Sequence, residues 1–404
     1  MSTSLLYHAY GLRRHDYLGT EYKGNTIILK VKTKKQYLQC NCCGSRDVIG
    51  RGKKEREFRA PPAGSKQVII RAVIQRFECK HCGKVHQERI DFADEKKTYT
   101  RGFQRYINDL CRVMTIEDAR KIAGVSWDTV KRIEQVYLQK HYSKPKLKEV
   151  LYIAIDEFAV QKGHKYMTVV MDLVRGHVLF VGEGKSAATL EPFWKRVRCS
   201  GAKIQAVAMD MWPAFIEAVI TNLPRAQIVF DRFHITKLVN DGLSELRRQL
   251  YRDEILLNKR PVIKGIRWLL LKNSANLKED KNEKEQLQQA LEINKPLAMA
   301  YYLKEELRLL WAQNSVEKAK DFLGKWVAKA YASGITVLKK IANTLLAHRS
   351  VIFAWFKYPI STGPLEGLNN KIKVLKRQAY GFRDNEFFKL KIYAIHQSKY
   401  ALCG

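Results

Sequence analysis

The stretch VLYIAIDEFAV, residues 150–160, constrains the fold more than any other part of the sequence. Its valine, isoleucine, leucine and tyrosine residues are typical of a buried strand, yet Asp156 and Glu157 interrupt it. A carboxylate in a buried strand is costly unless something offsets its charge. The fold must therefore supply a counter-charge at this strand.

The segments that follow alternate between strand and helix patterns. Two strand-like runs flank Arg175 and Gly176 as a hairpin, and the later strand-like runs end in Asp210 and Asp231. Helical patterns follow in SAATLEPFWKRV, PAFIEAVITNL and HITKLVNDGLSELRRQLY. The order β-β-β-α-β-α-β-α is that of a ribonuclease H-like mixed sheet, in which the first and fourth strands are neighbours. We therefore expect Asp156 and Asp210 to project toward one point.

A divalent cation would supply the counter-charge, because two close carboxylates otherwise repel each other. Oxygen ligands suit Mg²⁺ or Mn²⁺, and paired ions favour phosphodiester hydrolysis and transfer. Glu366, near the start of the helix predicted in GPLEGLNNKIKVLKR, is the candidate third ligand; an ordinary helix-start glutamate is the alternative. Candidate DNA contacts on this helix are Asn370, Lys373, Lys376 and Arg377.

Other acids and aromatic residues receive structural interpretations. Alternation along the strand sends Glu157 to the face opposite Asp156, where we expect it to be solvated or ion-paired. Packing is the favoured role for Trp212, with base stacking as the alternative. Core packing is also expected for three tryptophans of a later helical region, Trp268, Trp311 and Trp326.

Two CxxC pairs lie near the N-terminus, and a glycine follows each pair. Four thiolates can close a tetrahedral structural zinc site, and the glycines permit the tight turns that such a site needs. Strand patterns around the turn PPAGS complete a predicted zinc ribbon. Cys42 and His86 leave the ligand set open, and four reduced core cysteines are the alternative. The expected zinc ligands are Cys40, Cys43, Cys79 and Cys82.

Residues 115–138 predict a helix-turn-helix. Ile116, Ala119, Ile122 and Ala123 form one apolar helical face before Gly124, and Ser126 is a suitable N-cap for the second helix. In the second helix Val130, Ile133 and Val136 or Tyr137 repeat at helical spacing. The second helix of such a motif enters the major groove of DNA, and a structural helical hairpin is the alternative. The candidate contacts are Trp127, Lys131 and Arg132.

Charge supports a nucleic-acid partner. The 404 residues include 73 Lys and Arg against 40 Asp and Glu, a net charge of +33. Basic side chains replace the counterions of a polyanion, so DNA is favoured over a ribosome-associated role or a membrane surface. The sequence has neither a secretory signal nor a run long enough to span a membrane, so a cytoplasmic location is expected.

These motifs together resemble the ISL-three-type bacterial insertion-sequence transposases, a family of the DDE class. The resemblance rests on the CxxC pairs, the helix-turn-helix, IAIDEF, AMDMWPAF, FDRFH and GPLEGLNNKIKVLKR, in this order. It implies that Asp156, Asp210 and Glu366 form the metal-binding triad. It also implies an accessory Asp-x-x-His element at Asp231 and His234, and an all-helical insertion before Glu366.

The resemblance implies a transposase that binds the ends of its element and cleaves and joins DNA as a dimer or larger assembly. A structure-specific nuclease or resolvase of the same fold, and a DNA-binding regulator with an inactive nuclease domain, are the alternatives. The expected domains are a zinc ribbon at 1–95, a helix-turn-helix and linker at 96–148, the first catalytic part at 149–255, the helical insertion at 256–355, and the C-terminal catalytic part at 356–404.

Overall fold

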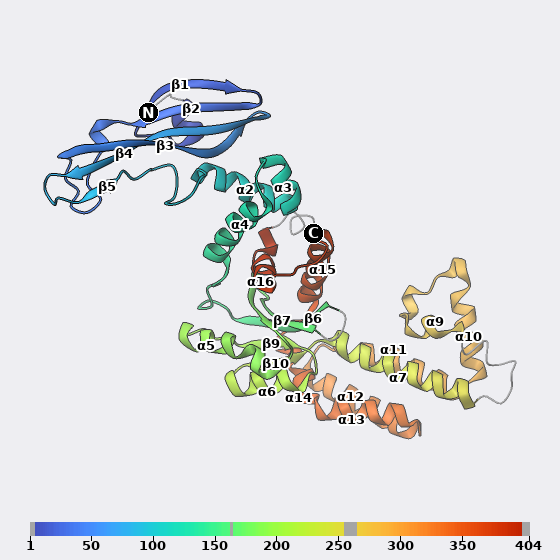
Figure 1. Cartoon of the computed structure of the whole chain (residues 1–404). Coiled ribbons are helices and arrows are strands. Elements are labelled where there is room, and N and C mark those ends of the chain that lie inside the picture. Colours follow the sequence, from blue (N-terminus) through green and yellow to red (C-terminus); the bar gives the residue numbers. More distant parts are fainter. Residues whose placement is uncertain (1–4, 162–164, 254–264, 398–404) are drawn as a thin grey trace. The chain divides into compact units, whose positions relative to one another are not determined.

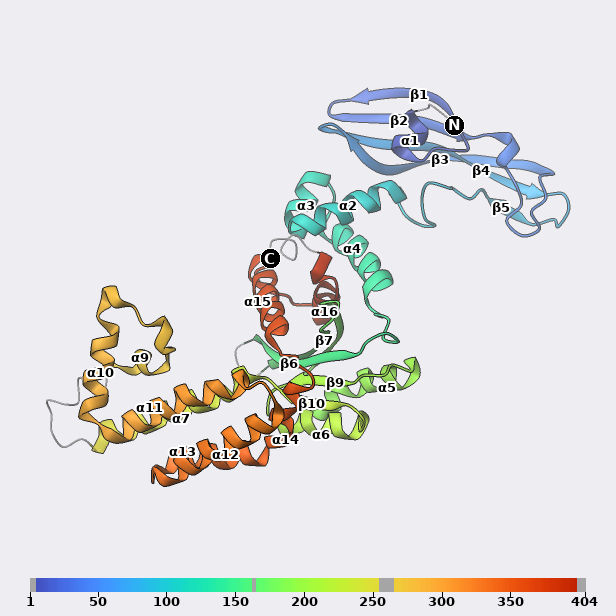
Figure 2. The ribbon, with the colours of Figure 1, turned by 180° about the vertical axis from the view of Figure 1, so that it is seen from behind.

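The computed structural model describes residues 5–161, 165–253 and 265–397 (Figures 1 and 2). The contacts among these residues define two compact units. One unit combines the positions up to 143 with those from 374 onward, and the other comprises positions 144–373. We had expected 356–404 to form one catalytic part, whereas the packing divides this stretch after residue 373. The first nine positions of the expected insertion, 256–264, lie outside the described residues.

A five-stranded sheet forms the larger part of the N-terminal unit (Figure 1). Its strands are β1 (His15–Lys23), β2 (Thr26–Thr33), β3 (Val48–Ala63), β4 (Lys66–Cys79) and β5 (Val85–Gln87). The order is β1-β2-β4-β3, with β5 paired to the C-terminal end of β4. Phe58 on β3 packs with Ile70 and Ile74 on β4 in a buried core. The predicted hairpin around PPAGS is therefore present as the long pair β3 and β4, within a larger sheet.

Three helices follow the sheet in the same unit: α2 (Arg101–Val113), α3 (Ile116–Ala123) and α4 (Trp127–Tyr142). The hydroxyl of Ser126 accepts a hydrogen bond from the N–H of Thr129, which confirms the predicted N-cap of α4. Ile122 is 56% exposed and does not lie in the core where periodicity placed it. Of the two alternatives on α4, Val136 is 62% exposed and Tyr137 is half-buried. The core instead draws on α2 through Phe103 and Ile107, because the motif contains a third helix.

Helix α16 (Asn385–Tyr393) packs against α4 within this unit. Lys391 donates to Glu134 at 2.6 Å, and Lys131 donates to Asp384, the N-cap of α16, at 2.8 Å. Glu134 is only 4% exposed, so removing its cation would leave a buried charge without compensation. The C-terminal segment is thus an integral part of the helix-turn-helix unit.

The second unit contains a mixed sheet of five strands: β6 (Tyr152–Gln161), β7 (Lys165–Asp172), β8 (Val178–Glu183), β9 (Ala206–Met209) and β10 (Gln227–Phe230). Their order is β10-β9-β6-β7-β8. The first three strands form an antiparallel meander, and β9 runs parallel to both β6 and β10. This is the ribonuclease H-like topology that the alternation of strands and helices predicted.

Helices complete the core of this sheet. Their bounds are α5 (Glu191–Ser200), α6 (Pro213–Asn222) and α7 (Arg232–Asp253). Helices α5 and α6 lie on the same side of the sheet in both views (Figures 1 and 2). Phe193 and Trp194 of α5 and Phe215 of α6 are buried among strand residues such as Val207. This packing fixes the strands whose ends carry the acids.

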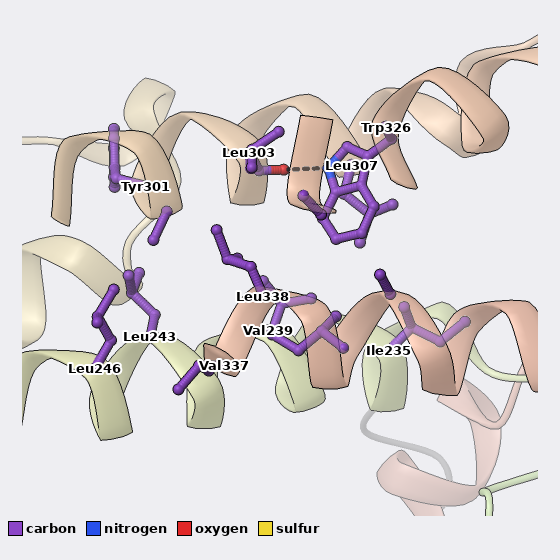
Figure 3. Close-up of a cluster of buried hydrophobic side chains, with 14 of the residues drawn as sticks. Ile235, Val239, Leu243, Leu246, Tyr301, Leu303, Leu307, Trp326, Val337 and Leu338 are labelled. Carbon is purple, nitrogen blue, oxygen red and sulfur yellow. Dashed lines mark hydrogen bonds between the residues drawn. The ribbon is translucent and has the colours of Figure 1, made fainter. Parts of the chain in front are cut away.

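The region between α7 and the last helices is helical, as expected. It contains α9 (Arg267–Leu271), α10 (Glu283–Ile293), α11 (Lys295–Leu307), α12 (Val316–Ala332), α13 (Thr336–Ala347) and α14 (Arg349–Phe353). Figure 3 shows Trp326 in its core, with the indole N–H donating to the carbonyl of Leu303 at 2.8 Å. Trp311 is also buried, but Trp268 is 65% exposed, contrary to the expectation for it. Within the described ranges, no helix has the length and apolar character needed to cross a bilayer.

Candidate active site and metal centre

The two CxxC turns bring four sulfur atoms together. The Sγ atoms of Cys40 and Cys82 lie 3.6 Å apart, and those of Cys43 and Cys79 lie 3.5 Å apart. All four sulfur atoms are within 4.8 Å of one another. Each turn closes through the N–H of its glycine, which has a positive φ and donates to the carbonyl of the first cysteine. The arrangement fits one tetrahedral metal ion.

The electrostatics of this cluster differ between its members. The backbone N–H of Cys43 contributes most to lowering the pKa of Cys40, to about 6, and the backbone N–H of Cys82 likewise lowers the pKa of Cys79. The backbone N–H groups of Lys84 and Ser45 lower the pKa values of Cys82 and Cys43, but burial and the neighbouring thiols outweigh them and raise the pKa of Cys82 to about 12 and also that of Cys43. Cys42 is exposed and accepts a hydrogen bond from Lys84. Neither Cys42 nor His86 belongs to the group of four, which resolves the ligand set that the sequence left open.

Asp156 and Asp210 lie on neighbouring parallel strands. Residues 152, 153 and 154 of β6 pair with residues 206, 207 and 208 of β9, an offset of 54 positions. The same offset matches Asp156 with Asp210, which directly follows β9. Asp210 Oδ1 accepts the N–H of Trp212 at 3.0 Å. The sheet therefore supports the two acids at equivalent heights, as the predicted topology requires.

Asp156 sits in an unfavourable environment for a negative charge. Burial raises its pKa to about 7, and the charges of Glu157 and Asp210 contribute in the same direction. Two groups oppose this shift: the N–H of Glu157 donates to Oδ1, and Asn369 Nδ2 donates to Oδ2, both at 2.8 Å. A cation bound here would relieve the repulsion between the acids.

Glu157 does not lie in solvent, contrary to the expectation from strand alternation. The side chain of Glu157 is half-buried. Burial raises the pKa of its carboxyl, and the charge of Asp210 acts in the same direction. Lys185 and Lys237 act in the opposite direction. Among the described residues, Glu157 Oε2 is buried without a hydrogen-bond partner. A second carboxylate therefore adds negative potential beside Asp156.

Helix α15 (Gly363–Gln378) brings Glu366 to a cleft of about 980 Å³ that Asp156 also lines. Asn369, one turn after Glu366, is the residue bonded to Asp156, so this face of the helix is tied to β6. Asn370 and Lys373 line the same cleft. In the described part of the chain, however, the cysteines are the only set of three or more side chains close enough to share an ion. Asp156 and Glu366 line this cleft, whereas Asp210 is not among its lining residues, and the three acids do not form such a set.

Asp231 is a structural anchor at the wall of this cleft. Its Oδ1 accepts the N–H of Phe233 at 2.8 Å, and its Oδ2 accepts the N–H of Thr362 at 2.7 Å and the hydroxyl of Thr362. Asp231 and Thr362 are 4% and 6% exposed. Because Thr362 immediately precedes α15, this contact fixes the start of the helix that carries Glu366. His234 also lines the cleft, and its ring packs against Phe233.

The helical insertion contributes one wall of the cleft. Its cleft-lining residues are Ser274, Glu305, Glu306, Arg308, Leu309 and Trp311. Glu305 accepts hydrogen bonds from Ser274 and Arg308, which hold this wall together. The insertion is therefore part of the site rather than a separate appendage.

The candidate DNA contacts differ in accessibility. Trp127 and Arg132 of α4 are exposed, whereas Lys131 is paired with Asp384 and lies over the rings of Trp127 and Phe387. On α15, Arg377 is exposed and Lys376 is partly buried. Lys131 thus has a structural task within its own unit that the motif pattern did not indicate.

Sequence reasoning missed three residues that organise the site. Thr362 acts through its contact with Asp231, 131 positions away. Asn369 acts through its bond to Asp156, 213 positions away. Lys185 lies between two aromatic rings beside the acids. A Ser-Thr pair before a helix start was the one local signal for Thr362.

A cysteine-rich ribbon and a helix-turn-helix in one unit, and a ribonuclease H-like sheet with acids at its strand ends in the other, define a DNA-binding enzyme of the DDE transposase class. Residues 153–392 match the DDE transposase family of the ISL3 type, residues 36–82 its zinc finger, and residues 88–135 its helix-turn-helix domain. The chain belongs to the ISL3 family of insertion-sequence transposases.

Curated relatives extend over nearly the whole chain. The transposase for insertion sequence element IS1001 of Bordetella parapertussis is 32% identical over 394 residues, covering 96% of this chain and 95% of the relative. The transposase for IS1557 of Mycobacterium tuberculosis is 26% identical over 386 residues, covering 89% and 86%. The Drosophila P element transposase strand transfer complex aligns at a TM-score of 0.39 and 8% identity, over 74% of this chain and 91% of that chain.

Proposed function

We propose that this transposase cleaves DNA at the ends of its insertion sequence and joins the released 3′ end to target DNA in one active site. Asp156, Asp210 and Glu366 would hold Mg²⁺ or Mn²⁺ in that site. The proposal is supported most strongly by the parallel pairing of β6 with β9, whose offset continues to Asp156 and Asp210, and by the cleft that Asp156 and Glu366 both line. The bound cations would activate the attacking oxygen and stabilise the leaving oxygen.

The residues of the chain fit this cation site chemically. Carboxylate oxygens are the ligands that these ions prefer, and the raised pKa of Asp156 indicates a site where added positive charge is favourable. Glu366 is exposed at the cleft, so its side chain can move toward the other acids when cations and DNA bind. Asn369 would keep Asp156 oriented during this movement, since it holds Oδ2.

Asp231 would act as a positioning residue. Its buried bonds to Thr362 fix the start of α15, and Glu366 lies in the first turn of that helix. His234 at the same wall would face the DNA strand in the cleft. Both roles are consistent with the Asp-x-x-His element that the family resemblance implies.

The N-terminal unit would recognise the element ends. We propose that Cys40, Cys43, Cys79 and Cys82 bind one structural Zn²⁺, and that α4 enters the major groove with Trp127 and Arg132. Lys373, Lys376, Arg377 and Asn370 of α15 would contact the DNA backbone. Two ends must be held together for joining, so we propose a homodimer or larger assembly on DNA, acting in the bacterial cytoplasm at the nucleoid.

Cleavage assays with the full chain test this function. Purified protein is mixed with labelled element-end duplex and Mg²⁺, in parallel with the variants Asp156→Asn, Asp210→Asn and Glu366→Gln. We expect all four proteins to bind the duplex, and cleavage by each variant to fall by about two orders of magnitude or more. Undiminished cleavage by one variant would remove that residue from the site, and a parent that cuts without joining would favour the nuclease alternative.

A further inference from the structure

Lys185 lies in an aromatic clamp beside the acids. Its ammonium is 4.4 Å from the ring centroid of Tyr166 and 4.7 Å from that of Trp212. Both rings attract the charge through their faces. The lysine is partly buried, so the clamp holds the ammonium in one place while leaving one side accessible.

The backbone around Lys185 is held as firmly as its side chain. The indole N–H of Trp212 donates to the carbonyl of Lys185 at 3.2 Å. The preceding residue, Gly184, donates to the carbonyl of Tyr166 at 2.8 Å and accepts the hydroxyl of Thr168 at 2.7 Å. The loop that follows β8 is thereby attached both to β7 and to the segment that follows β9.

The same tryptophan connects the clamp to the active site. The backbone N–H of Trp212 donates to Asp210 Oδ1 at 3.0 Å, while its indole bonds to Lys185. Lys185 also lies close enough to Glu157 to oppose the rise in the pKa of that carboxyl. A fixed cation therefore stands at the Asp210 side of the acid group.

Lys185 retains hydrogen-bonding capacity for an anion. Within the described residues, no carboxylate lies within ion-pair distance of its ammonium, in contrast to Lys131 and Lys391. Among the described residues, its ammonium also donates no hydrogen bond to a protein acceptor, so N–H groups that face away from the two rings are available to an anion. A clamped ammonium also loses less conformational entropy on binding than a mobile side chain does.

We propose that Lys185 binds a phosphate of the DNA strand next to the cleaved bond, so that this strand enters the active site along Asp210. This assignment rests on the proposed function, because it places DNA at the acids. The phosphate would lie on the ammonium rather than between the carboxylates, which repel it. Trp212 and Tyr166 would be positioning residues, since they act through Lys185.

The test pairs one side chain with one phosphate. A set of element-end duplexes is prepared, each with one phosphate replaced by an uncharged methylphosphonate. The replaced positions surround the cleaved bond, or cover the whole end if no cleavage is found. Their affinities for the full-length parent and for Lys185→Gln are measured without divalent cations. We expect one or two positions to weaken binding by the parent about tenfold and to have no effect on Lys185→Gln.

Three variants serve as controls. Lys195→Gln removes an exposed lysine of α5 and should keep the sensitivity pattern of the parent. Lys185→Arg keeps the positive charge, so its DNA affinity should show the methylphosphonate sensitivity that Lys185→Gln lacks. Tyr166→Leu removes one ring and should reduce the sensitivity without abolishing it. Thermal unfolding of each protein verifies that it is folded.

Identical methylphosphonate profiles for the parent and Lys185→Gln would overturn the assignment, whether or not the protein cleaves DNA. A failure of the proposed function has a different signature: the parent would not cut in Mg²⁺, while the phosphate-specific difference at Lys185 could still be present. A uniform loss of affinity in Lys185→Gln with an unchanged profile would show a purely structural role and would also overturn it.

Discussion

Asp231 and Thr362 are 131 positions apart in sequence, yet the N–H of Thr362 donates to Asp231 Oδ2 at 2.7 Å in the buried interior. The hydroxyl of Thr362 donates to the same oxygen. This contact joins the end of β10 to the start of α15 across the whole helical insertion. The geometry of Glu366 thus depends on a bond made outside the insertion itself.

Thr362→Val removes the hydroxyl donor while nearly preserving side-chain volume. We expect the free energy of unfolding to fall by about 1–3 kcal/mol, because the buried Asp231 carboxylate loses a partner. DNA cleavage should fall further than this loss of stability explains, since Glu366 is displaced. Urea unfolding and single-turnover cleavage measure the two effects.

Thr362→Ser is the matched control, because it keeps the hydroxyl and removes only a methyl group. It should retain most of the cleavage activity of the parent. Equal activities for the valine and serine variants would contradict a positioning role for the Asp231 contact.

The raised pKa of Asp156 predicts how the stability of the folded protein changes with pH. Its folded pKa of about 7 lies above the ordinary aspartate value, so this group favours folding only while it is protonated. Its contribution is fully present below about pH 4 and is lost as pH rises through roughly 4 to 7. In EDTA, Asp156→Asn should therefore be more stable than the parent at pH 8 by about 1–3 kcal/mol.

The difference between Asp156→Asn and the parent should shrink when unfolding is measured at pH 5. Asp241→Asn, which makes the same substitution at an exposed position of α7, provides the matched control. A stability gap that stays constant between pH 5 and pH 8 would be inconsistent with a raised pKa at Asp156.

The grouping of the four cysteines predicts which cysteine substitutions release zinc. Cys79→Ser removes one of four converging sulfur atoms, so bound zinc should drop well below one ion per chain and binding to element ends should weaken. Cys42→Ser changes an exposed cysteine of the other turn, between Cys40 and Cys43, that is not part of the group. It should keep one zinc per chain, as measured by metal analysis after dialysis; equal zinc loss in both variants would count against the assigned ligand set.

Gly242 of α7 lies against Val337 and Ile341 of α13. A Cβ at this position would lie 2.8 Å from Ile341 Cδ1 and 2.9 Å from Val337 Cγ1. Gly242→Ala should therefore lower the free energy of unfolding by about 1–2 kcal/mol through overpacking. Gly324→Ala, in α12 with no atom within 4 Å of its Cβ, should raise stability by about 0.5–1 kcal/mol. Denaturant unfolding compares the two, and a stabilising Gly242→Ala would disprove the close contact.

Local pattern predicted much of this molecule. The order of strands and helices predicted the sheet topology, because runs of apolar strand residues alternate with helical patterns after residue 177. The paired CxxCG turns gave the sulfur cluster. Helix boundaries at Ser126 followed from capping chemistry that acts over three residues.

The remaining features depend on long-range packing, which local sequence patterns do not reveal. Periodicity placed Ile122 in a core, but α2 occupies that role and Ile122 is exposed. Lys131 looked available for DNA until Asp384, 253 positions later, proved to be its partner. Strand alternation alone assigned Glu157 to solvent or an ion pair, and alternation contains no information on the charges that Asp210 and Lys185 bring to the same place.

The packing of α16 against α4 has a consequence for the order in which the protein is made. The helices α3 and α4 are synthesised early, but the lysine that neutralises Glu134 and the aspartate that pairs with Lys131 follow their partners by 257 and 253 positions. A nascent or prematurely terminated chain therefore lacks a finished DNA-reading unit. We expect such a fragment to compete poorly for element ends, because α4 would lack the contacts that α16 supplies.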